Sequence, residues 1–365
     1  MILEKLSKIN KEKHKASAAK AVALAVILML TAASLSACGG SPGSSGALGS
    51  SSRGSGKGGR LKVVTTSFAA WDWTRQVLGD RADDAQVTYL LDNGVDMHSY
   101  QPDAEDIGKI LDADLFIYVG GTSDSWVKDV LKSADDPPEA IDLMETLGSG
   151  VKLEERVQGM EEEPDEEAGH EHGDEHGGEG GHSHSDLEYD EHVWMSPANA
   201  ILFTRAIQEK LSSIDPDHAG EYGDNAASYI SRLEELQRDY QEAVDGSRHK
   251  TIVVADRFPF RYLTDEFGIK YYAAFAGCSA ESEASFDTVI FLAGKVSELD
   301  VPMVLRTETG TDDLPDIIIE ASGRKNVSVG VLDSMQSVRS SQMENGVTYI
   351  SIMRKDLKVI KRALN

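Results

Sequence analysis

The stretch DHAGEYGDNAASYISRLEELQRDYQEAVD, residues 217–245, predicts one long helix in the middle of the 365-residue chain. Its apolar side chains recur at helical spacing, and they are Tyr222, Ala226, Tyr229, Ile230, Leu233, Leu236, Tyr240 and Val244. This spacing places them on one face of the helix. A helix of about 28 residues is about 42 Å long at 1.5 Å per residue, so it can connect two lobes as a rigid element.

Short apolar strand patterns alternate with helical patterns on both sides of this helix. The expected strands are 61–67, 86–91 and 114–120 before it, and 251–256, 269–277, 301–307 and 327–333 after it. The other expected helices are 71–78, 102–113, 123–134, 197–213, 262–268 and 285–299. Alternation of this kind is typical of parallel sheets covered by helices. No internal repeat is evident beyond the coarse similarity of the two halves.

The fold class is therefore α/β, with two Rossmann-like lobes of mostly parallel sheets joined by a long rigid helix. We expect an N-terminal lobe at 61–214, a connecting helix at 215–246 and a C-terminal lobe at 247–365. Residues 154–191 interrupt the pattern with sixteen Asp or Glu, one Arg, five His and many Gly. We interpret them as an exposed loop without core-forming residues, and expect them to be disordered.

The N-terminal segment has the features of a targeting sequence. Residues 1–20 are rich in Lys, and the apolar run from Ala21 to Leu30 is too short to span a bilayer comfortably. Leu35-Ser36-Ala37-Cys38 resembles a bacterial lipobox, in which Cys38 is lipidated and becomes the mature N-terminus. We therefore predict a signal peptide at 1–37 and a lipid-anchored Gly/Ser tether at 38–60. An uncleaved membrane anchor is the alternative, and both place the body outside the cytoplasm.

Composition excludes two classes of protein. The net charge of −26 argues against binding nucleic acid, whose phosphates require clustered Lys and Arg. With only two cysteines, Cys38 and Cys278, a scaffold held by several disulfides is excluded by count. The acidity fits a secreted protein or one that meets cations, although it can also serve solubility alone.

Two histidines stand at candidate ligand positions. His98 lies in NGVDMHSYQP, between an expected strand and a helix, where ligand-binding residues of open α/β sheets collect. His192 lies in YDEHVWMSP, just before a helix, with Asp190 and Glu191 beside it to orient the imidazole. Each is also compatible with a histidine in an ordinary surface loop.

A third group of histidines lies within the acidic insert, and its members are His170, His172, His176, His182 and His184. Imidazoles with nearby carboxylates bind zinc, but a Gly-rich segment does not form a closed site, so we expect weak, exchangeable binding. The letters HGDEH also match a metallopeptidase pattern. That chemistry needs a stable helix, and the surrounding glycines argue against one.

The second half offers one thiol and three carboxylates. Cys278, in GCSAESEAS, is a soft zinc ligand if it ionises, and a small buried apolar side chain if it does not. Asp256, Glu308 and Asp333 each follow an expected strand, so each can face the other lobe. Any of them can complete a metal site or cap a helix.

Four segments together, over residues 61–360, resemble the zinc/manganese class of ABC-transporter solute-binding lipoproteins. They are NGVDMHSYQP, the acidic His-rich insert, YDEHVWMSP and GCSAESEAS, in the family's order. The resemblance implies two α/β lobes joined by a rigid helix, with metal between them. It carries the family's first two histidine ligands onto His98 and His192.

The family's third histidine has no counterpart, because its place falls near Asp256 or Arg257. Guanidinium stays protonated and cannot ligate metal. Cys278 is our first candidate for the third ligand and Glu308 our second, and the family's carboxylate falls on Asp333. Two histidines, a thiolate and a carboxylate suit zinc, whereas completion by oxygen alone makes manganese credible.

These residues lead to one main hypothesis and three alternatives. The main hypothesis is a monomeric, lipid-anchored receptor on the outer face of the bacterial cytoplasmic membrane, which captures zinc and delivers it to an ABC permease. A zinc hydrolase is disfavoured, since no helical H-E-x-x-H and no serine elbow is present. A surface adhesin on the same fold, and a receptor for a metal complex or another solute, remain open alternatives.

Overall fold

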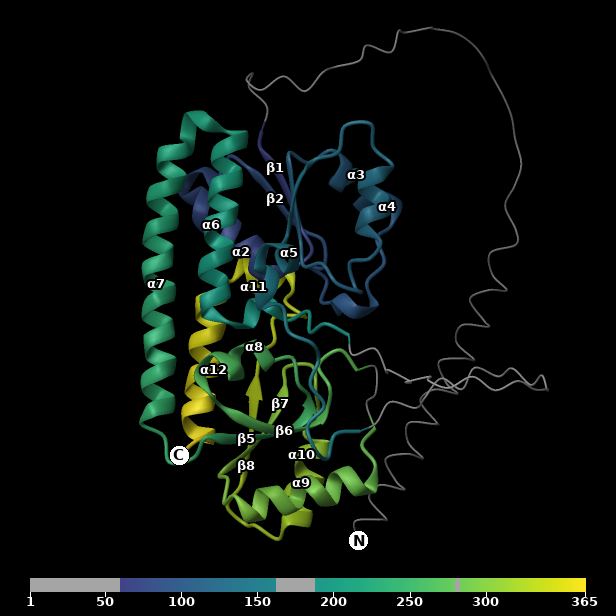
Figure 1. The fold of residues 1–365 in the computed structure, drawn as a ribbon, viewed down its shortest axis with the longest axis vertical. Helices are drawn as coiled ribbons and strands as arrows, with labels where there is room; N and C mark the ends of the chain where they lie inside the picture. Colours follow the sequence, from purple (N-terminus) through teal and green to yellow (C-terminus); the bar gives the residue numbers. More distant parts are fainter. Residues whose placement is uncertain (1–59, 162–187, 280–282) are drawn as a thin grey trace, which may run out of the picture. The chain divides into compact units, whose positions relative to one another are not determined.

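The computed structural model describes residues 60–161, 188–279 and 283–365 (Figure 1). Cys38 and the five histidines between 170 and 184 lie outside the described residues, so the predictions made for them stay predictions. No helix in the described ranges is both long and apolar enough to cross a membrane.

The N-terminal lobe contains a sheet of four parallel strands in the order β2-β1-β3-β4. The strands are β1 (Lys62–Thr65), β2 (Gln86–Tyr89), β3 (Leu115–Tyr118) and β4 (Glu139–Asp142). The helices are α2 (Phe68–Leu78), α3 (Ala104–Leu111), α4 (Val127–Lys132) and α5 (Leu143–Leu147). β4 and α5 had no expected counterpart, because EAID is short, half polar and preceded by two prolines.

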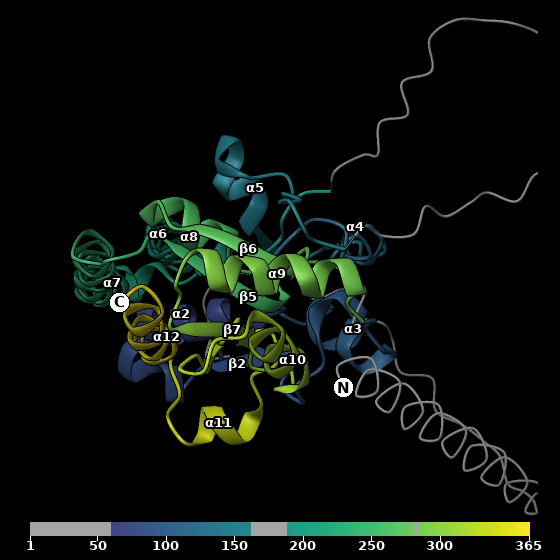
Figure 2. The ribbon, with the colours of Figure 1, turned by 90° about the horizontal axis from the view of Figure 1, so that it is seen from below.

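The C-terminal lobe repeats this arrangement with a parallel sheet in the order β6-β5-β7-β8. Its strands are β5 (Thr251–Arg257), β6 (Lys270–Phe275), β7 (Met303–Thr307) and β8 (Ser328–Leu332). Its helices are α8 (Arg261–Phe267), α9 (Phe286–Glu298), α10 (Asp313–Ser322), α11 (Ser340–Glu344) and α12 (Tyr349–Ala363). Seen from below, α9 and α10 lie side by side across one face of the sheet (Figure 2).

Two antiparallel neighbours, α6 (Pro197–Ile214) and α7 (Ala219–Asp245), tie the lobes together (Figure 1). α7 contacts α2 of the first lobe and α8 and α12 of the second. Its buried tyrosines attach it to both lobes, because Tyr229 donates to Asp72 Oδ2 of α2 at 3.2 Å and Tyr240 donates to the Met353 carbonyl of α12 at 2.7 Å. The predicted α/β fold with two lobes and a long connecting helix is confirmed.

The ends of the acidic insert correct one expectation. The described flanks are not exposed throughout, since Met160, Asp190 and Glu191 are buried while Glu155 and Tyr189 are exposed. The backbone N–H of Glu161 donates to the Ala274 carbonyl at the end of β6. The burial of Asp190 and Glu191 could not be predicted from the sequence, because acidic residues are mostly exposed unless they are paired.

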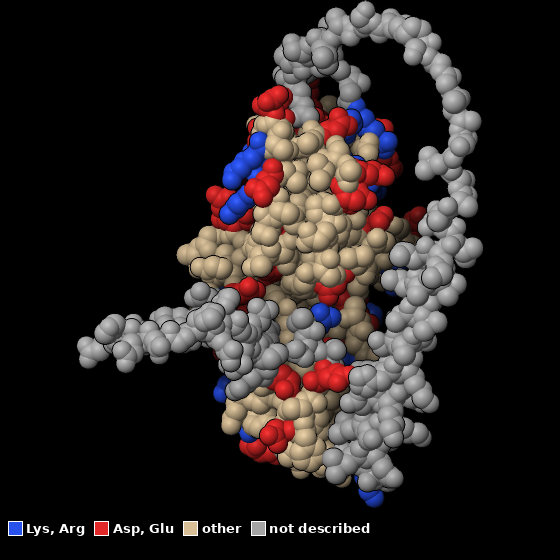
Figure 3. Space-filling view, turned by 90° about the vertical axis from the view of Figure 1, so that its right-hand side faces the viewer, with Lys and Arg blue, Asp and Glu red and all other residues tan. Residues whose placement is uncertain are grey.

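Charged side chains are mixed in sign on the face of the molecule shown in Figure 3. Lys and Arg lie beside Asp and Glu at its upper end, and few charged groups occur across its middle. The uncovered part of this face therefore carries no continuous basic track of the kind that binds phosphates.

Candidate metal centre

Three side chains with metal-binding atoms converge between the lobes. His98, His192 and Cys278 place their ligand atoms within 4.8 Å of one another, and they are the cluster found among the described residues. His98 lies in a short 3-10 turn (Met97–Ser99) in the loop after β2, and His192 directly precedes another (Val193–Met195) that leads into α6. Cys278 lies in the turn after β6. The three metal-binding side chains are thus far apart in the sequence, and separate loops bring them together.

His192 is completely buried and held by its own acidic neighbour. Asp190 Oδ1 lies 2.9 Å from the backbone nitrogen and 2.9 Å from Nδ1 of His192. Burial opposes the charged imidazole, but the Asp190 carboxylate outweighs it and raises the pKa of His192. Because Nδ1–H donates to Asp190, the Nε2 lone pair is directed into the cluster, as is usual for a histidine that binds metal.

His98 presents the same atom from the opposite side. Its Nδ1 lies 2.9 Å from Ser123 Oγ and 3.5 Å from Glu191 Oε2, while its Nε2 lies 3.3 Å from His192 Nε2. Burial and the neighbouring His192 lower the pKa of His98, so the neutral ring is favoured. Glu191 Oε2 is buried without a hydrogen-bond partner among the described residues, and it faces the Nδ1 edge of His98.

The position of Cys278 depends on how closely the backbone of Gly277 approaches the imidazole ring of His192. A Cβ atom added to the preceding Gly277 would lie 3.0 Å from the Phe258 carbonyl and 3.2 Å from His192 Cε1, so a larger residue there displaces the turn. The backbone N–H of Cys278 donates to Glu154 Oε1 at 2.7 Å. Burial, followed by the negative charge of Glu154, raises the pKa of the thiol. The thiol is therefore protonated until a cation displaces the proton.

Gln336 is the residue of this site that the sequence analysis missed. Its amide Nε2 lies 3.0 Å from Nε2 of His98 and 3.0 Å from Nε2 of His192. An amide NH₂ group has two hydrogens, one for each imidazole lone pair. It thus occupies the place between the two rings where a cation would lie. The preceding residue, Met335, has φ 64°, a left-handed conformation that is rare outside glycine and turns Gln336 toward the rings.

Glu308 and Asp333, both predicted as ligands, are not in the cluster, and each has another role. Glu308 Oε2 accepts the Ser334 backbone N–H at 2.8 Å, and its Oε1 lies 2.8 Å from Ser334 Oγ. Asp333 Oδ1 accepts the Met335 N–H at 3.0 Å. The two carboxylates therefore hold the turn that presents Gln336.

The place of the missing family histidine is also occupied by other interactions. Asp256 Oδ2 accepts the backbone N–H of Thr307 at 3.0 Å and lies 2.7 Å from its Oγ1, so it joins β5 to β7. Arg257 forms an ion pair with Asp96, with Nη1 3.2 Å from Oδ2. Neither side chain points a donor atom at the two histidines.

The geometry fits a tetrahedral ion. Two nitrogens that each lie about 2.0–2.1 Å from zinc, at the tetrahedral angle, are about 3.3 Å apart. The observed separation of His98 Nε2 from His192 Nε2 is 3.3 Å. A thiolate at about 2.3 Å from the same ion lies about 3.6 Å from each nitrogen, and the ligand atoms of the three residues lie within 4.8 Å of one another.

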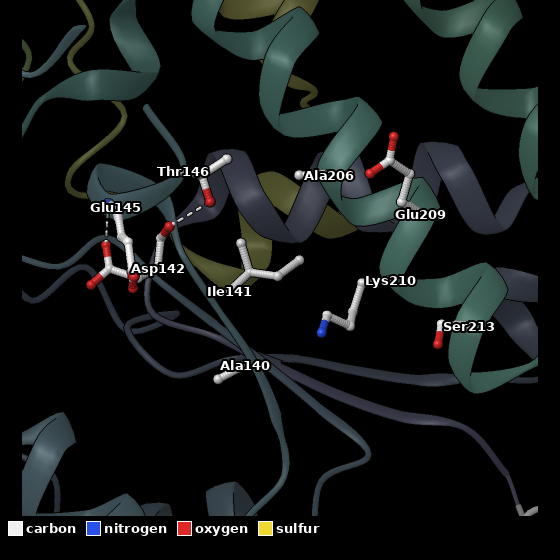
Figure 4. A pocket seen from close by; sticks show the side chains of 9 residues that line it. All are labelled: Ala140, Ile141, Asp142, Glu145, Thr146, Ala206, Glu209, Lys210 and Ser213. Carbon is white, nitrogen blue, oxygen red and sulfur yellow. Dashed lines mark hydrogen bonds between the residues drawn. The ribbon is translucent and has the colours of Figure 1, made fainter. Parts of the chain in front are cut away.

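The groove drawn in Figure 4 is a separate place with different chemistry. It lies between β4, α5 and α6, encloses about 450 Å³ and takes its charged groups from Asp142, Glu145, Glu209 and Lys210. Asp142 is used locally, since its carboxylate accepts the Glu145 N–H and its carbonyl accepts the Thr146 hydroxyl. The residues that line this groove include no histidine or cysteine, so it does not compete with the cluster as a zinc site.

Two α/β lobes with parallel sheets, a long helix that joins them and metal-binding side chains at the loops between them form the architecture of a metal-binding solute-binding protein. The chain belongs to the ZnuA family, described as zinc-uptake complex component A, periplasmic, which it matches over residues 63–363. This is a family of transport receptors and not of enzymes.

Individual relatives agree with this assignment. The chain is 32% identical over 304 residues to the zinc-binding lipoprotein AdcA of Streptococcus pneumoniae R6, which covers 83% of this chain and 56% of AdcA. It is 30% identical over 308 residues to the high-affinity zinc uptake system protein ZnuA of Bacillus subtilis 168, covering 84% and 89%. It thus spans little more than half of AdcA but most of the Bacillus protein.

A solved structure shows the same fold. The Zn(II)-bound ZnuA-like domain of Streptococcus pneumoniae AdcA superposes with a TM-score of 0.62 at 28% identity, over 84% of this chain and 99% of that domain.

Proposed function

We propose that this protein is an extracytoplasmic receptor that binds one zinc ion between its lobes and delivers it to an ABC importer. The observation that supports this most directly is the meeting of His98, His192 and Cys278, with the two Nε2 atoms 3.3 Å apart, in a chain of the zinc-uptake family. The relatives AdcA and ZnuA are named for zinc binding and zinc uptake.

In this proposal the two imidazoles and the Cys278 thiolate are three zinc ligands, and Gln336 is the fourth. The last side-chain torsion of glutamine is broad and roughly two-fold, so the amide can rotate and turn Oε1 toward the ion. In the structure the same amide nitrogen lies 3.0 Å from the Nε2 atom of each imidazole, where its two hydrogens can be donated to them. Binding therefore replaces two hydrogen bonds with metal–ligand bonds, without leaving a buried nitrogen unpaired.

The donor set favours zinc over manganese. A thiolate and two imidazoles are softer than the carboxylate and carbonyl oxygens that suit manganese. Glu308 and Asp333, the two carboxylates considered as ligands, are engaged with the 333–336 turn, and Asp190 and Glu191 lie at the Nδ1 edges of the rings rather than at the Nε2 atoms. Manganese binding, our earlier alternative, is accordingly expected to be weak.

The route of delivery follows from the N-terminal segment and the family. We propose that Cys38 carries a lipid, that residues 39–60 tether the body to the outer face of the membrane, and that a membrane permease accepts the ion. The histidines between 170 and 184 are proposed to gather metal loosely before it enters the tight site. An adhesive role remains a second candidate that shares the fold, and no contact among the described residues favours it over transport.

The test is zinc titration of the full-length mature chain in competition with a chelator strong enough to hide the weak sites. We expect one tight equivalent in the wild type and its loss in His98→Ala, by more than about 100-fold, because a lost ligand costs more than a lost supporting contact. His249→Ala, which removes an imidazole outside the cluster, is the matched control and should bind normally. Absence of any tight equivalent from the wild type contradicts the proposed function.

A further inference from the structure

One carboxylate connects the turn that carries His98 to the opposite lobe. Asp96 Oδ1 accepts the backbone N–H of His98 at 3.1 Å, and its Oδ2 accepts from Arg257 Nη1 at 3.2 Å. Both side chains are about three-quarters buried, with 27% of Asp96 and 28% of Arg257 exposed. The contact is charge-assisted and only partly open to solvent, which makes it stronger than an exposed ion pair.

Arg257 is fixed at the edge of the sheet that leads to the thiol. It is the last residue of β5 and pairs, after a shift of register, with Phe275, the last residue of β6 and three residues before Cys278. The neighbouring Asp256 does not neutralise its guanidinium, because that carboxylate accepts from Thr307 and from the Arg257 backbone N–H. The ion pair therefore joins the His98 turn to the strand pair from which Cys278 extends.

A second contact holds the start of the same loop. Asn93 forms an isolated antiparallel bridge with Arg339, and the Ser340 N–H donates to the Asp92 carbonyl at 2.7 Å. Gly94, with φ 81°, allows this approach, since a Cβ there would lie 2.7 Å from Arg339 Nε. The loop from β2 to His98 is thus attached to the C-terminal lobe near its start and again at its His98 end, where the Asp96–Arg257 contact lies beside that of Gln336 with the His98 ring.

We propose that Asp96 and Arg257 are positioning residues that keep His98 on the ion and thereby set the rate of metal release; this rests on the proposed function. When the ion pair is lost, the Asn93 and Ser340 contacts still hold the loop to the lobe, so the fold and the entry of metal change little. The His98 end is then held less firmly, by Ser123 and Gln336 without the ion pair, and moves away from the ion more often. Release becomes faster while association stays nearly constant.

The experiment measures zinc dissociation from the full-length mature protein into excess chelator by stopped flow, with association measured separately. Arg257→Gln and Asp96→Asn should each raise the dissociation rate about tenfold, the scale of a charge-assisted hydrogen bond. Asp96→Asn keeps an oxygen for the His98 N–H, so it isolates the ion pair. Arg257→Lys, which keeps the charge, should restore part of the slow release.

Two further measurements separate positioning from a general loss of structure. The double variant should release zinc no faster than either single variant, because both remove the same contact, and the melting temperature of the metal-free protein should fall by no more than about 2–4 °C. Arg306→Gln, which breaks an ion pair with Asp312 elsewhere in the lobe, is the control. Unchanged release in both single variants, or additive effects in the double variant, overturns the proposal, whereas failure of the wild type to hold one tight zinc overturns the proposed function itself.

Discussion

The two lobes share one strand order and differ in how they present a metal donor. In β2-β1-β3-β4 and β6-β5-β7-β8, the second strand in sequence lies at the edge, and the loop that follows it carries a member of the cluster. His98 is the ninth residue after the end of β2, whereas Cys278 is the third after the end of β6. Equivalent places in the two lobes thus supply an imidazole on a long loop and a thiol on a tight turn.

The difference in loop length determines how each donor is held. The Cys278 turn is packed against His192 through Gly277 and against Glu154 through its backbone. The His98 loop has local support from Asp96 and Ser123, and it is also held by contacts from the other lobe. A scaffold of two similar lobes can therefore present one donor on a tight turn and another on a long loop whose contacts come from both lobes.

The largest effect in this comparison is expected on zinc affinity, when the thiol that the C-terminal lobe supplies is replaced. Cys278→Ser should weaken zinc binding about 100-fold, because a neutral hydroxyl is a poor ligand for zinc. Cys278→His should still bind zinc tightly, since it places an imidazole, which is also a zinc ligand, on both edge-strand loops. Chelator competition measures both affinities.

Cobalt substitution makes the thiolate visible. The Co²⁺ form of the wild type should show a thiolate-to-metal charge-transfer band, and this band should be missing from both Cys278 variants. Gln241→Ala, on the exposed side of α7, is the control variant and should give the same Co²⁺ spectrum as the wild type. A wild-type spectrum without the band, together with normal zinc binding in Cys278→Ser, would remove Cys278 from the site.

Much of the fold could be predicted from sequence because its signals are local. The apolar run in β3 and the helical spacing in α7 each specify an element without reference to the rest of the chain. The strand β4 could not be predicted, since EAID has one buried residue and gains its place from pairing with β3. Tertiary pairing overrides weak local preference in such short strands.

The candidate site likewise contains residues that could be predicted from the sequence and one that could not. His98, His192 and Cys278 are uncommon residue types in suggestive positions, so the sequence could name them. Gln336 is a common polar residue, and its role depends on the left-handed Met335, which no local pattern announces. Glu308 and Asp333 were attractive because carboxylates ligate metals, but the same oxygens also cap turns, and only the folded geometry distinguishes the two uses.

A smaller effect is expected when the amide that faces both histidines is changed. Gln336→Ala should weaken zinc binding about tenfold, because it removes a neutral oxygen ligand and leaves two imidazole lone pairs without a donor in the metal-free protein. Gln336→Glu should bind zinc and manganese more tightly, since a carboxylate adds negative charge and a hard oxygen. Isothermal titration with both metals checks the pair, and equal zinc affinity in wild type and Gln336→Ala would show that the amide is not a ligand.

The smallest effect concerns the buried carboxylate that closes the loop after β3. Asp124 Oδ2 accepts the N–H groups of Val119 and Gly120, and burial raises its pKa to about 7. The folded protein therefore keeps a proton that the unfolded chain, with a carboxyl pKa near 3.8, has released. Since the folded state binds more protons in this window, the free energy of unfolding falls as pH rises from about 4 to about 7.

Asparagine at this position does not titrate, so Asp124→Asn should make that fall shallower by at most about 1.4 kcal/mol per pH unit, the value for one proton. Denaturant unfolding of the metal-free protein at several pH values between 4.5 and 7.5 measures the slope. Asp112→Asn, at an exposed carboxylate of the same lobe, is the matched control and should keep the wild-type slope. Parallel slopes for wild type and Asp124→Asn would mean that Asp124 stays ionised in the fold, stabilised by its N–H donors, and that the first lobe closes its β3 loop without storing a proton.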